Sequence, residues 1–211
     1  MISAENIFLL FMAYCIGALP FSILAGKLLK GIDIREYGSG NAGATNTFRV
    51  LGKKAGIPVL ILDICKGLAA VSLVSYTSYL PNSDIYLNLQ LVFGITAVLG
   101  HIFPVYVGFR GGKGVATLLG FMIGVFPLAA ALSISVFVIC LLVSKYVSFS
   151  SIVSSIFFPI GVYYFSENLI STLFIFSIFV PVLLIATHHA NIERLIKGEE
   201  NKVNLKIKKN K

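Results

Sequence analysis

The sequence predicts an all-α polytopic membrane protein, folded as a single domain over residues 1–211. Hydrophobic residues make up 57% of the chain and charged residues only 12%, which is about half the charged share of an average soluble domain. The mean hydropathy is +0.90, and apolar runs of membrane-spanning length follow one another along the chain. The connections between them are too short to bury a core of their own, so no separate soluble domain is expected.

The first apolar run, about residues 6–26, is expected to remain in the membrane as a helix. Glu5 precedes it and Lys27 and Lys30 follow it, so it lacks the basic leader of a signal peptide and places the N-terminus outside. Further apolar runs follow at about 57–79, 86–107, 115–144, 147–165 and 169–187. The polar segments between and after these runs are about 27–55, 108–117, 144–151 and 188–211.

The number of spans depends on residues 115–144, which are too long for one simple span of about 20 residues. One tilted helix would give six spans and place Lys145 and the basic tail outside. Two helices with a break near Phe126–Pro127 give seven, because proline disfavours a helix interior. Every outer segment then lacks Lys and Arg, as the positive-inside rule requires. We therefore predict seven transmembrane helices with a short helix over about 115–126, an outside N-terminus and a cytoplasmic C-terminus. The four polar segments then share the cytoplasmic face.

The formal net charge of +8 does not indicate a nucleic-acid-binding protein. The basic residues lie in the connections and the tail, where membrane topology places them, and not on one amphipathic face. We therefore expect membrane lipids among the partners, and no nucleic acid.

A glycine- and hydroxyl-rich segment, residues 38–52, is the main candidate for a binding site. Small residues allow backbone N–H groups to turn together toward an anion, phosphate above all. Short polar side chains accompany them, and Arg49 adds a planar, permanently charged group that suits a phosphate. The candidate residues are Gly38, Ser39, Gly40, Asn41, Thr45, Asn46 and Arg49. Taken alone, this segment is equally compatible with a glycine-rich connector that binds nothing.

A second glycine-rich segment precedes the run that begins near residue 115. Its candidate phosphate contacts are Gly111, Gly112, Lys113 and Gly114, with the lysine as a mobile point charge at the start of a helix. It is not a Walker A loop, since Gly114 stands where Ser or Thr must follow the lysine. For Arg110 a positive-inside anchor is the preferred interpretation, and His101 is expected to pack in its helix or bond a carbonyl.

The third polar segment begins at His188. Helical spacing places His188, Asn191 and Leu195 on one face. Asn191 offers a donor and an acceptor there, and His188 can hold or pass a proton. Glu193 and Lys197 are expected to form only a surface pair.

Polar residues also occur within or beside the apolar runs. Ser148, Ser150 and Ser151 could bond a substrate, although serines that cap a helix start are commoner. Asp63 and Lys66 lie at helical spacing inside the second run, where charges must pair or face a polar cavity. We expect them to form a compensated pair that braces the site from beneath.

Together these segments resemble the bacterial acyl-phosphate:glycerol-3-phosphate acyltransferases, the PlsY family. The resemblance covers essentially the whole chain, and three motifs in the same order make it specific. It rests on Gly38–Asn41 with Thr45, Asn46 and Arg49; on Gly111–Thr117; on His188 with Asn191, Ile192, Arg194 and Leu195; on Gly198–Glu200; and on Asp63, Lys66, Gly67 and Tyr146–Ser148. The chain departs from the family pattern at His189, where arginine is usual. Whether this chain makes the cationic contact that the arginine would provide is therefore open.

The resemblance implies an enzyme of the bacterial inner membrane, with its site facing the cytoplasm, that transfers a fatty acyl group from acyl-phosphate to the 1-hydroxyl of sn-glycerol 3-phosphate. The products would be 1-acyl-sn-glycerol 3-phosphate (lysophosphatidic acid) and phosphate, and no cofactor or metal is implied. By similarity, the catalytic set is Ser39, Arg49, Lys113, His188 and Asn191. The glycines of the first two motifs bind substrate together with Asn41, Thr45, Asn46, Ser148 and Ser151. The structural supports are Asp63, Lys66 and Glu200.

The implied chemistry needs positioning and charge stabilisation, since a mixed anhydride is already activated and no acyl-enzyme is required. The general base stays open between an oxygen of the substrate phosphate and His188. The alternative function is a membrane transporter of an organic phosphate, which would have inverted halves with broken helices meeting at mid-membrane. No such repeat is visible in the sequence, and the polar segments gather at one interface, so we favour the acyltransferase.

Overall fold

The computed structural model describes residues 3–81, 83–166 and 170–203, and the regular elements in these ranges are helices. The predicted all-α class is therefore confirmed for the part of the chain that the structure describes. The chain forms two compact units, Met1–Pro127 and Leu128–Lys211, which are described one at a time.

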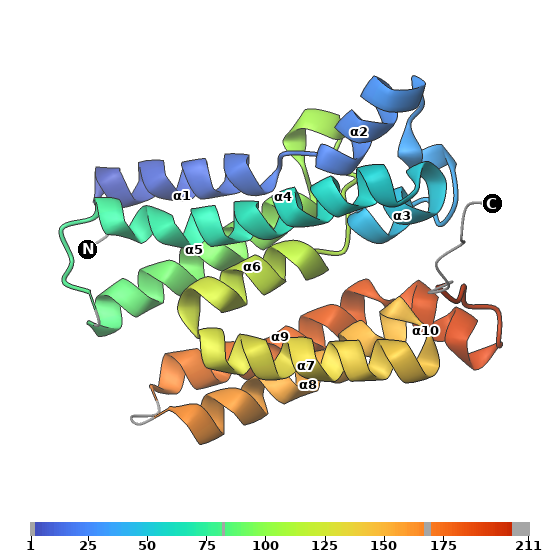
Figure 1. Ribbon diagram of the computed structural model, residues 1–211. Helices are drawn as coiled ribbons and strands as arrows, with labels where there is room; N and C mark the ends of the chain where they lie inside the picture. The colour runs from blue at the N-terminus through green and yellow to red at the C-terminus, as the bar shows by residue number, and fades with distance from the viewer. Residues whose placement is uncertain (1–2, 82, 167–169, 204–211) are drawn as a thin grey trace. The chain divides into compact units, whose positions relative to one another are not determined.

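In the first unit, a group of long helices carries the polar segments at one end. The α-helices of its described part are α1 (Ala4–Gly17), α2 (Phe21–Lys30), α3 (Ala44–Leu51), α4 (Lys53–Ser72), α5 (Asp84–Ile102) and α6 (Val115–Val125). Short 3-10 helices lie between them: η1 (Ile34–Glu36), η2 (Leu73–Tyr76) and η3 (Val105–Val107). α1, α4, α5 and α6 pack against one another, and α2 and α3 lie at one end of this group beside the start of α4 (Figure 1).

The first apolar run is not one continuous helix, so the predicted helix over about 6–26 is wrong in this respect. It breaks between Gly17 and Phe21, because Pro20 has no N–H to donate and cannot continue the helical ladder. The carbonyl oxygen of Leu19, in the break, accepts a hydrogen bond of 3.0 Å from Nζ of Lys66. The break therefore connects the first apolar run to the charged pair on α4.

α4 and α6 approach so closely that their backbones touch. A Cβ at Gly67 would overlap the carbonyl oxygen of Thr117, and a Cβ at Gly120 would overlap that of Ile64. Only glycine fits these two positions, and small residues permit the same close contact in other membrane helix pairs. This packing holds the N-terminal turn of α6, which follows Lys113, firmly against α4.

In the second unit, four helices follow one another with short connections. They are most of α7 (Pro127–Ser144), α8 (Val147–Phe165), α9 (Ser171–Thr187) and α10 (His189–Ile196). α8 packs along α9, where the rings of Phe158 and Phe176 meet edge to face with centroids 6.3 Å apart. Four serines of α8 donate their hydroxyl hydrogens to carbonyls one turn earlier, which satisfies them in an apolar environment: Ser150, Ser151, Ser154 and Ser155.

The described helices make the chain a multi-pass membrane protein. The segments with the length and composition of a span are Ala4–Lys30, Lys53–Tyr76, Asp84–Val107, Pro127–Ser144 and Val147–Phe165, five in all. The pair of α9 and α10, bent by 64° at His188, would make a sixth. The break predicted near Phe126–Pro127 is confirmed, since α6 ends at Val125 and α7 begins at Pro127. α6 has 11 residues and is about 16 Å long, so it is the short helix that was expected here. The count of seven spans and their orientation stay predictions.

Within each unit the polar connections gather at one end. In the first unit this end carries α2, residues 31–43, α3 and the connection from α5 to α6 (Figure 1). In the second unit it carries the connection from α7 to α8, α10 and residues 198–203, where the N–H of Val203 donates to the carbonyl oxygen of Lys145 at 2.8 Å. The prediction that all polar segments share one face of the membrane concerns both units together and stays a prediction. Residues 204–211 of the last polar segment lie outside the described residues.

Candidate functional site

The first polar segment is largely helical, and its irregular backbone is confined to residues 31–33, 37–43 and 52. The predicted loop over about 27–55 is therefore wrong at both ends, since α2 continues to Lys30 and α3 begins at Ala44. Thr45, Asn46 and Arg49 consequently lie on a helix, α3, whose residues Asn46, Arg49 and Val50 place side-chain atoms beside Gly38 of the glycine turn of residues 37–43.

The side-chain amide of Asn46 organises this glycine turn. Its Oδ1 accepts a hydrogen bond of 2.9 Å from the N–H of Ser39, and its Nδ2 donates to the carbonyl oxygens of Ile34 and Tyr37, both at 3.0 Å. Gly38 has a φ of +64° and a Cβ there would overlap Oδ1 of Asn46, so the turn requires glycine. Both N–H groups of Asn46 are used, which leaves it no donor for the phosphate contact that was predicted for it.

Several backbone N–H groups that were predicted to bind an anion are also occupied. The N–H of Gly40 donates to the carbonyl oxygen of Tyr37 at 3.1 Å. In the second motif, Gly111 donates to the carbonyl oxygen of Ile102 at 3.0 Å and Gly112 to that of His101 at 3.1 Å. These three glycines therefore close turns in the present conformation and do not form an open nest of N–H groups.

The accessible part of the first motif lies on the outer side of the turn and of α3. Ser39, Gly40, Thr45 and Arg49 are exposed, and Asn41 is half-buried. α3 begins after Gly43 without a side-chain cap, so its first N–H groups have no acceptor inside the helix and can donate to an anion. Arg49 lies one turn after Thr45 on the same face, and its guanidinium has no ion pair with the described residues.

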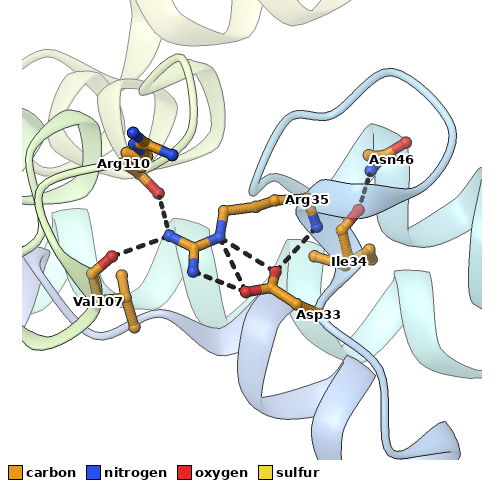
Figure 2. A network of polar contacts seen from close by, with 6 residues as sticks. All are labelled: Asp33, Ile34, Arg35, Asn46, Val107 and Arg110. Atoms are coloured by element: carbon orange, nitrogen blue, oxygen red, sulfur yellow. Dashed lines mark hydrogen bonds and ion pairs between the residues drawn. The ribbon is translucent and has the colours of Figure 1, made fainter.

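Arg35 joins the first motif to the segment that leads to the second (Figure 2). Its Nε donates to Oδ1 of Asp33 at 3.0 Å and its Nη2 to Oδ2 at 2.6 Å, while its Nη1 donates to the carbonyl oxygens of Val107 at 2.8 Å and Arg110 at 3.2 Å. The hydrogen bond from Arg35 holds the pKa of the Asp33 carboxyl below its ordinary value, and the same bond raises the pKa of Arg35.

The connection from α5 to α6 folds back onto the end of α5. A Cβ at Gly112 would overlap the ring of His101 and lie 2.9 Å from the carbonyl oxygen of Ala42, so glycine is needed for this close contact. Gly114 is the N-cap of α6, with a φ of 82° and no side-chain cap. α6 therefore begins with N–H groups that lack an intrahelical acceptor, directly after the half-buried Lys113.

A small cavity lies beneath these segments in the first unit. It is lined by the break between α1 and α2, by Ala42 and Gly111, and by Asp63, Lys66 and His101. Oδ1 of Asp63 lies 2.8 Å from Nζ of Lys66 and 3.6 Å from Nδ1 of His101. The predicted pair of Asp63 and Lys66 is confirmed. His101 is buried in the helix packing, as expected, and its ring also faces the carboxylate of Asp63 on α4.

In the second unit, Glu200 collects the polar groups of the third motif. Its Oε1 accepts hydrogen bonds from Ser148 Oγ at 2.9 Å and Asn191 Nδ2 at 2.7 Å, and its Oε2 accepts one from Arg194 Nε at 2.8 Å. Burial alone would raise the pKa of Glu200, but the bonds from Asn191, Arg194 and Ser148 outweigh it and hold the pKa below its ordinary value. Glu200 therefore joins residues 198–203 to α8 and α10, and its role as a structural support stays a prediction.

The geometry around His188 and Asn191 defines which atoms can serve a ligand. Nδ1 of His188 lies 2.8 Å from the carbonyl oxygen of Leu184. Since a carbonyl only accepts, Nδ1 carries the proton, and Nε2 is the nitrogen of the neutral ring that can accept one. The contact with Glu200 fixes the amide of Asn191, whose Oδ1 then has no donor among the described residues.

The remaining predictions for the second unit can be placed directly. Ser148 bonds Glu200, and Ser151 donates back to Val147 at 2.9 Å, so both predicted substrate contacts are engaged internally. Lys197 and Glu193 form the expected exposed pair at 2.7 Å. His189 is exposed, with Nδ1 3.1 Å from the carbonyl oxygen of Ala186.

The replacement Glu200→Gln is expected to lower the free energy of unfolding by about 2–3 kcal/mol, because hydrogen bonds to a buried charged acceptor are among the stronger ones. Since the folded-state pKa is lowered, this contribution is complete above the unfolded pKa and is lost as the pH falls through the folded value. Thermal unfolding of detergent-solubilised protein at several pH values measures both effects. Glu193→Gln, at an exposed pair, is the matched control and should change little; equal shifts in the two variants would contradict the assignment.

Two features of this arrangement were not found from the sequence pattern: the bridging role of Arg35, and the contact of His101 with Asp63. The pattern Asp33-x-Arg35 just before the glycines was the available signal for Arg35. For His101 no local signal exists, because its partner lies on another helix. Within the first unit the structure brings together the first two motifs, and within the second unit it brings together Ser148, Asn191, Arg194 and Glu200.

Comparison with known proteins places this arrangement in a family. The family model described as Glycerol-3-phosphate acyltransferase matches residues 7–198. Glycerol-3-phosphate acyltransferase of Chlorobium phaeobacteroides (strain DSM 266) is 44% identical over 223 residues, which cover 92% of this chain and 95% of the relative. That of Chlorobaculum tepidum is 44% identical over 216 residues, with 90% and 93% covered.

Solved structures agree with these relatives. A crystal structure of PlsY (YgiH), an integral membrane glycerol 3-phosphate acyltransferase in its glycerol 3-phosphate form, has a TM-score of 0.84 and 36% identity, covering 95% of this chain and 96% of that one. Its lysophosphatidic acid form has a TM-score of 0.81 with the same identity and coverage. Because the family model spans nearly the whole chain and the relatives align over nearly their whole length, this chain belongs to the glycerol-3-phosphate acyltransferase family.

Proposed function

We propose that this chain transfers a fatty acyl group from acyl-phosphate to the 1-hydroxyl of sn-glycerol 3-phosphate. The products are 1-acyl-sn-glycerol 3-phosphate and phosphate, and the reaction is the first acylation of phospholipid synthesis. The observation that carries this proposal is the match, over nearly the whole chain, to proteins named glycerol-3-phosphate acyltransferase. The glycerol 3-phosphate and lysophosphatidic acid forms of the structural relative correspond to the acceptor and the product of this reaction.

Two cations with different surroundings are assigned to the phosphate groups. Arg49 is exposed in the last turn of α3, on the same face as Thr45, and its side chain lies beside Gly38, next to the exposed Ser39. A guanidinium suits bidentate contact with phosphate oxygens. Lys113 precedes the uncapped start of α6 and acts as a compact point charge. Lys113 thus lies directly before a helix N-terminus, and the two effects add at a bound phosphate.

The acyl transfer needs no covalent enzyme intermediate. The 1-hydroxyl oxygen attacks the carbonyl carbon of the mixed anhydride, a C–O ester bond forms, and the C–O bond to the phosphate leaving group breaks. The hydroxyl proton passes to a phosphate oxygen of the substrate or to Nε2 of His188, which the bond from Nδ1 to Leu184 leaves as the accepting nitrogen. Oδ1 of Asn191 is suited to accept from a glycerol hydroxyl, since it has no donor among the described residues.

The proposal includes an orientation in the bacterial inner membrane. Seven spans with an outside N-terminus and a cytoplasmic C-terminus place the motifs on the cytoplasmic side. The basic residues beside α2, α3 and the α5–α6 connection support this orientation, since Lys and Arg collect in cytoplasmic connections.

An assay with purified protein in detergent tests the donor. The protein is given sn-glycerol 3-phosphate with palmitoyl-phosphate in one series and palmitoyl-CoA in the other, and both phosphate and 1-acylglycerol 3-phosphate are measured. We expect at least about 100-fold faster product formation from the acyl-phosphate, because the leaving group is part of the recognised substrate. Equal rates with both donors would contradict the assigned donor. Release of neither product would favour the transporter, which requires sealed vesicles.

A further inference from the structure

The half-buried Arg35 has an arrangement that distinguishes it from the exposed basic residues of the first unit. Its guanidinium contacts Asp33 on one side and the carbonyl oxygens of Val107 and Arg110 on the other (Figure 2). These two partners lie 72 and 75 residues further along the chain. A single side chain therefore connects the motif that contains Arg49 with the segment that leads to Lys113.

The contacts of Arg35 continue into both motifs through short, ordered steps. On one side, Ile34 follows Asp33 and its carbonyl oxygen accepts from Asn46, which also holds the turn at Ser39. On the other side, the N–H of Gly111, next to Arg110, is bonded to the end of α5. Only two residues then separate Arg110 from Lys113. A shift of the guanidinium would thus move the two motifs relative to each other.

Arg35 is mostly engaged with protein acceptors. A guanidinium has five N–H donors, and four of those of Arg35 point to Asp33, Val107 and Arg110: one on Nε, two on Nη1 and one on Nη2. Arg49 differs in this respect, since no ion pair with the described residues occupies it. The two arginines are therefore built for different tasks, one for holding protein and one for holding a ligand.

We propose that Arg35 is a positioning residue that sets the separation between Arg49 and Lys113, and thereby the alignment of the acyl donor with its acceptor. This inference rests on the proposed function. Each substrate is bound by its own local groups, so the loss of Arg35 changes how the bound substrates meet more than how tightly each one binds. A misplacement of about 1 Å in such a site costs on the order of 100-fold in rate.

The test compares initial-rate kinetics of the full chain with those of Arg35→Gln, Arg35→Lys and Arg110→Gln. In Arg35→Gln we expect kcat to fall about 10- to 100-fold, while the KM for glycerol 3-phosphate and that for palmitoyl-phosphate each change less than about threefold. Arg35→Lys keeps the charge but cannot bridge a carboxylate and two carbonyls, so it should recover little. Arg110→Gln removes a neighbouring charge but keeps the carbonyl oxygen that Arg35 contacts, and it should retain most of the activity.

The outcomes separate positioning from folding and from simple charge. Near-normal kcat in Arg35→Gln, an increase in KM alone, or an equal loss in Arg110→Gln would each overturn the proposal. If Arg35→Gln fails to accumulate, Arg35→Ala takes its place and is assayed with and without guanidinium ion at a non-denaturing concentration. A kcat that the added guanidinium restores supports the proposal, and a kcat that it does not change overturns it. The unmodified chain is assayed in parallel. If the unmodified chain is inactive, the proposed function is refuted. If the unmodified chain and the Arg35 variants are all active, only the role of Arg35 is refuted.

Discussion

Replacing Arg49 or Lys113 by alanine is expected to lower the rate of acyl transfer at least about 100-fold, because removal of one preorganised electrostatic contact in an active site costs on the order of 100- to 1000-fold. The yield of folded protein should not change. Arg49 is exposed and Lys113 is half-buried, so neither truncation opens a core cavity. The measurement is the initial rate with acyl-phosphate together with the monodisperse yield from size-exclusion chromatography.

Two further variants show whether the charge or its geometry matters. Arg49→Lys keeps a positive charge but loses the planar fork, so a bidentate phosphate contact predicts an activity near that of Arg49→Ala. Lys54→Ala, at an exposed position in the first turn of α4, removes a basic residue outside the motifs and should leave the rate unchanged. If Arg49→Ala or Lys113→Ala keeps more than about a tenth of the activity, that residue is not one of the main phosphate contacts.

The membrane class and the helix break at Pro127 could be predicted because both depend on local composition. Apolar runs and a proline without an N–H are visible in the sequence itself. The same reasoning applied to Pro20 would have found the break between α1 and α2. It was missed because the charge pattern around the first run already agreed with one continuous helix.

Helix α3 was hidden by its own composition. Residues 44–51 contain Thr, Asn and Val, which are weak helix formers, directly after a glycine-rich stretch. Tertiary contacts outweigh this preference: α3 packs against α4, and Asn46 is 1% exposed while it bonds the preceding turn. The sequence showed that Gly38 and Gly112 matter, but not that each makes room for a close neighbour, Asn46 and His101 respectively.

The candidate site was predictable at the level of motifs and not at the level of contacts. Glycine, hydroxyl and basic residues identify a phosphate site by type, and the family resemblance assigns them roles. Which polar groups are already engaged depends on partners far along the chain, as with Ser148 and Glu200 or Arg35 and Val107. Spacing in the sequence cannot give such pairs, because helix packing brings them together.

The replacement Asp63→Leu is expected to be among the most destabilising single changes in the chain, with a loss of about 3–5 kcal/mol in the free energy of unfolding. Asp63 is 1% exposed and Lys66 is 4% exposed, and their charges lie 2.8 Å apart. Without the carboxylate, the ammonium group of Lys66 would retain its bond to the Leu19 carbonyl oxygen and its contact with the ring of Phe21, but it would lose its ion-pair partner. An unpaired charge at this depth is costly in a protein interior and in a membrane.

A double-mutant cycle of Asp63→Leu and Lys66→Met, measured as thermal unfolding in detergent, tests this compensation. The double variant should be more stable than either single variant, because apolar side chains of similar volume replace a buried ion pair without leaving a charge behind. Additive losses would contradict a compensated pair. Activity then separates support from positioning: a stable but inactive double variant would mean that the pair also orients His101, whose ring touches Gly112. If the double variant is stable and active, the pair has only the bracing role. Apolar side chains that fill the same space beneath the second motif are then sufficient for activity.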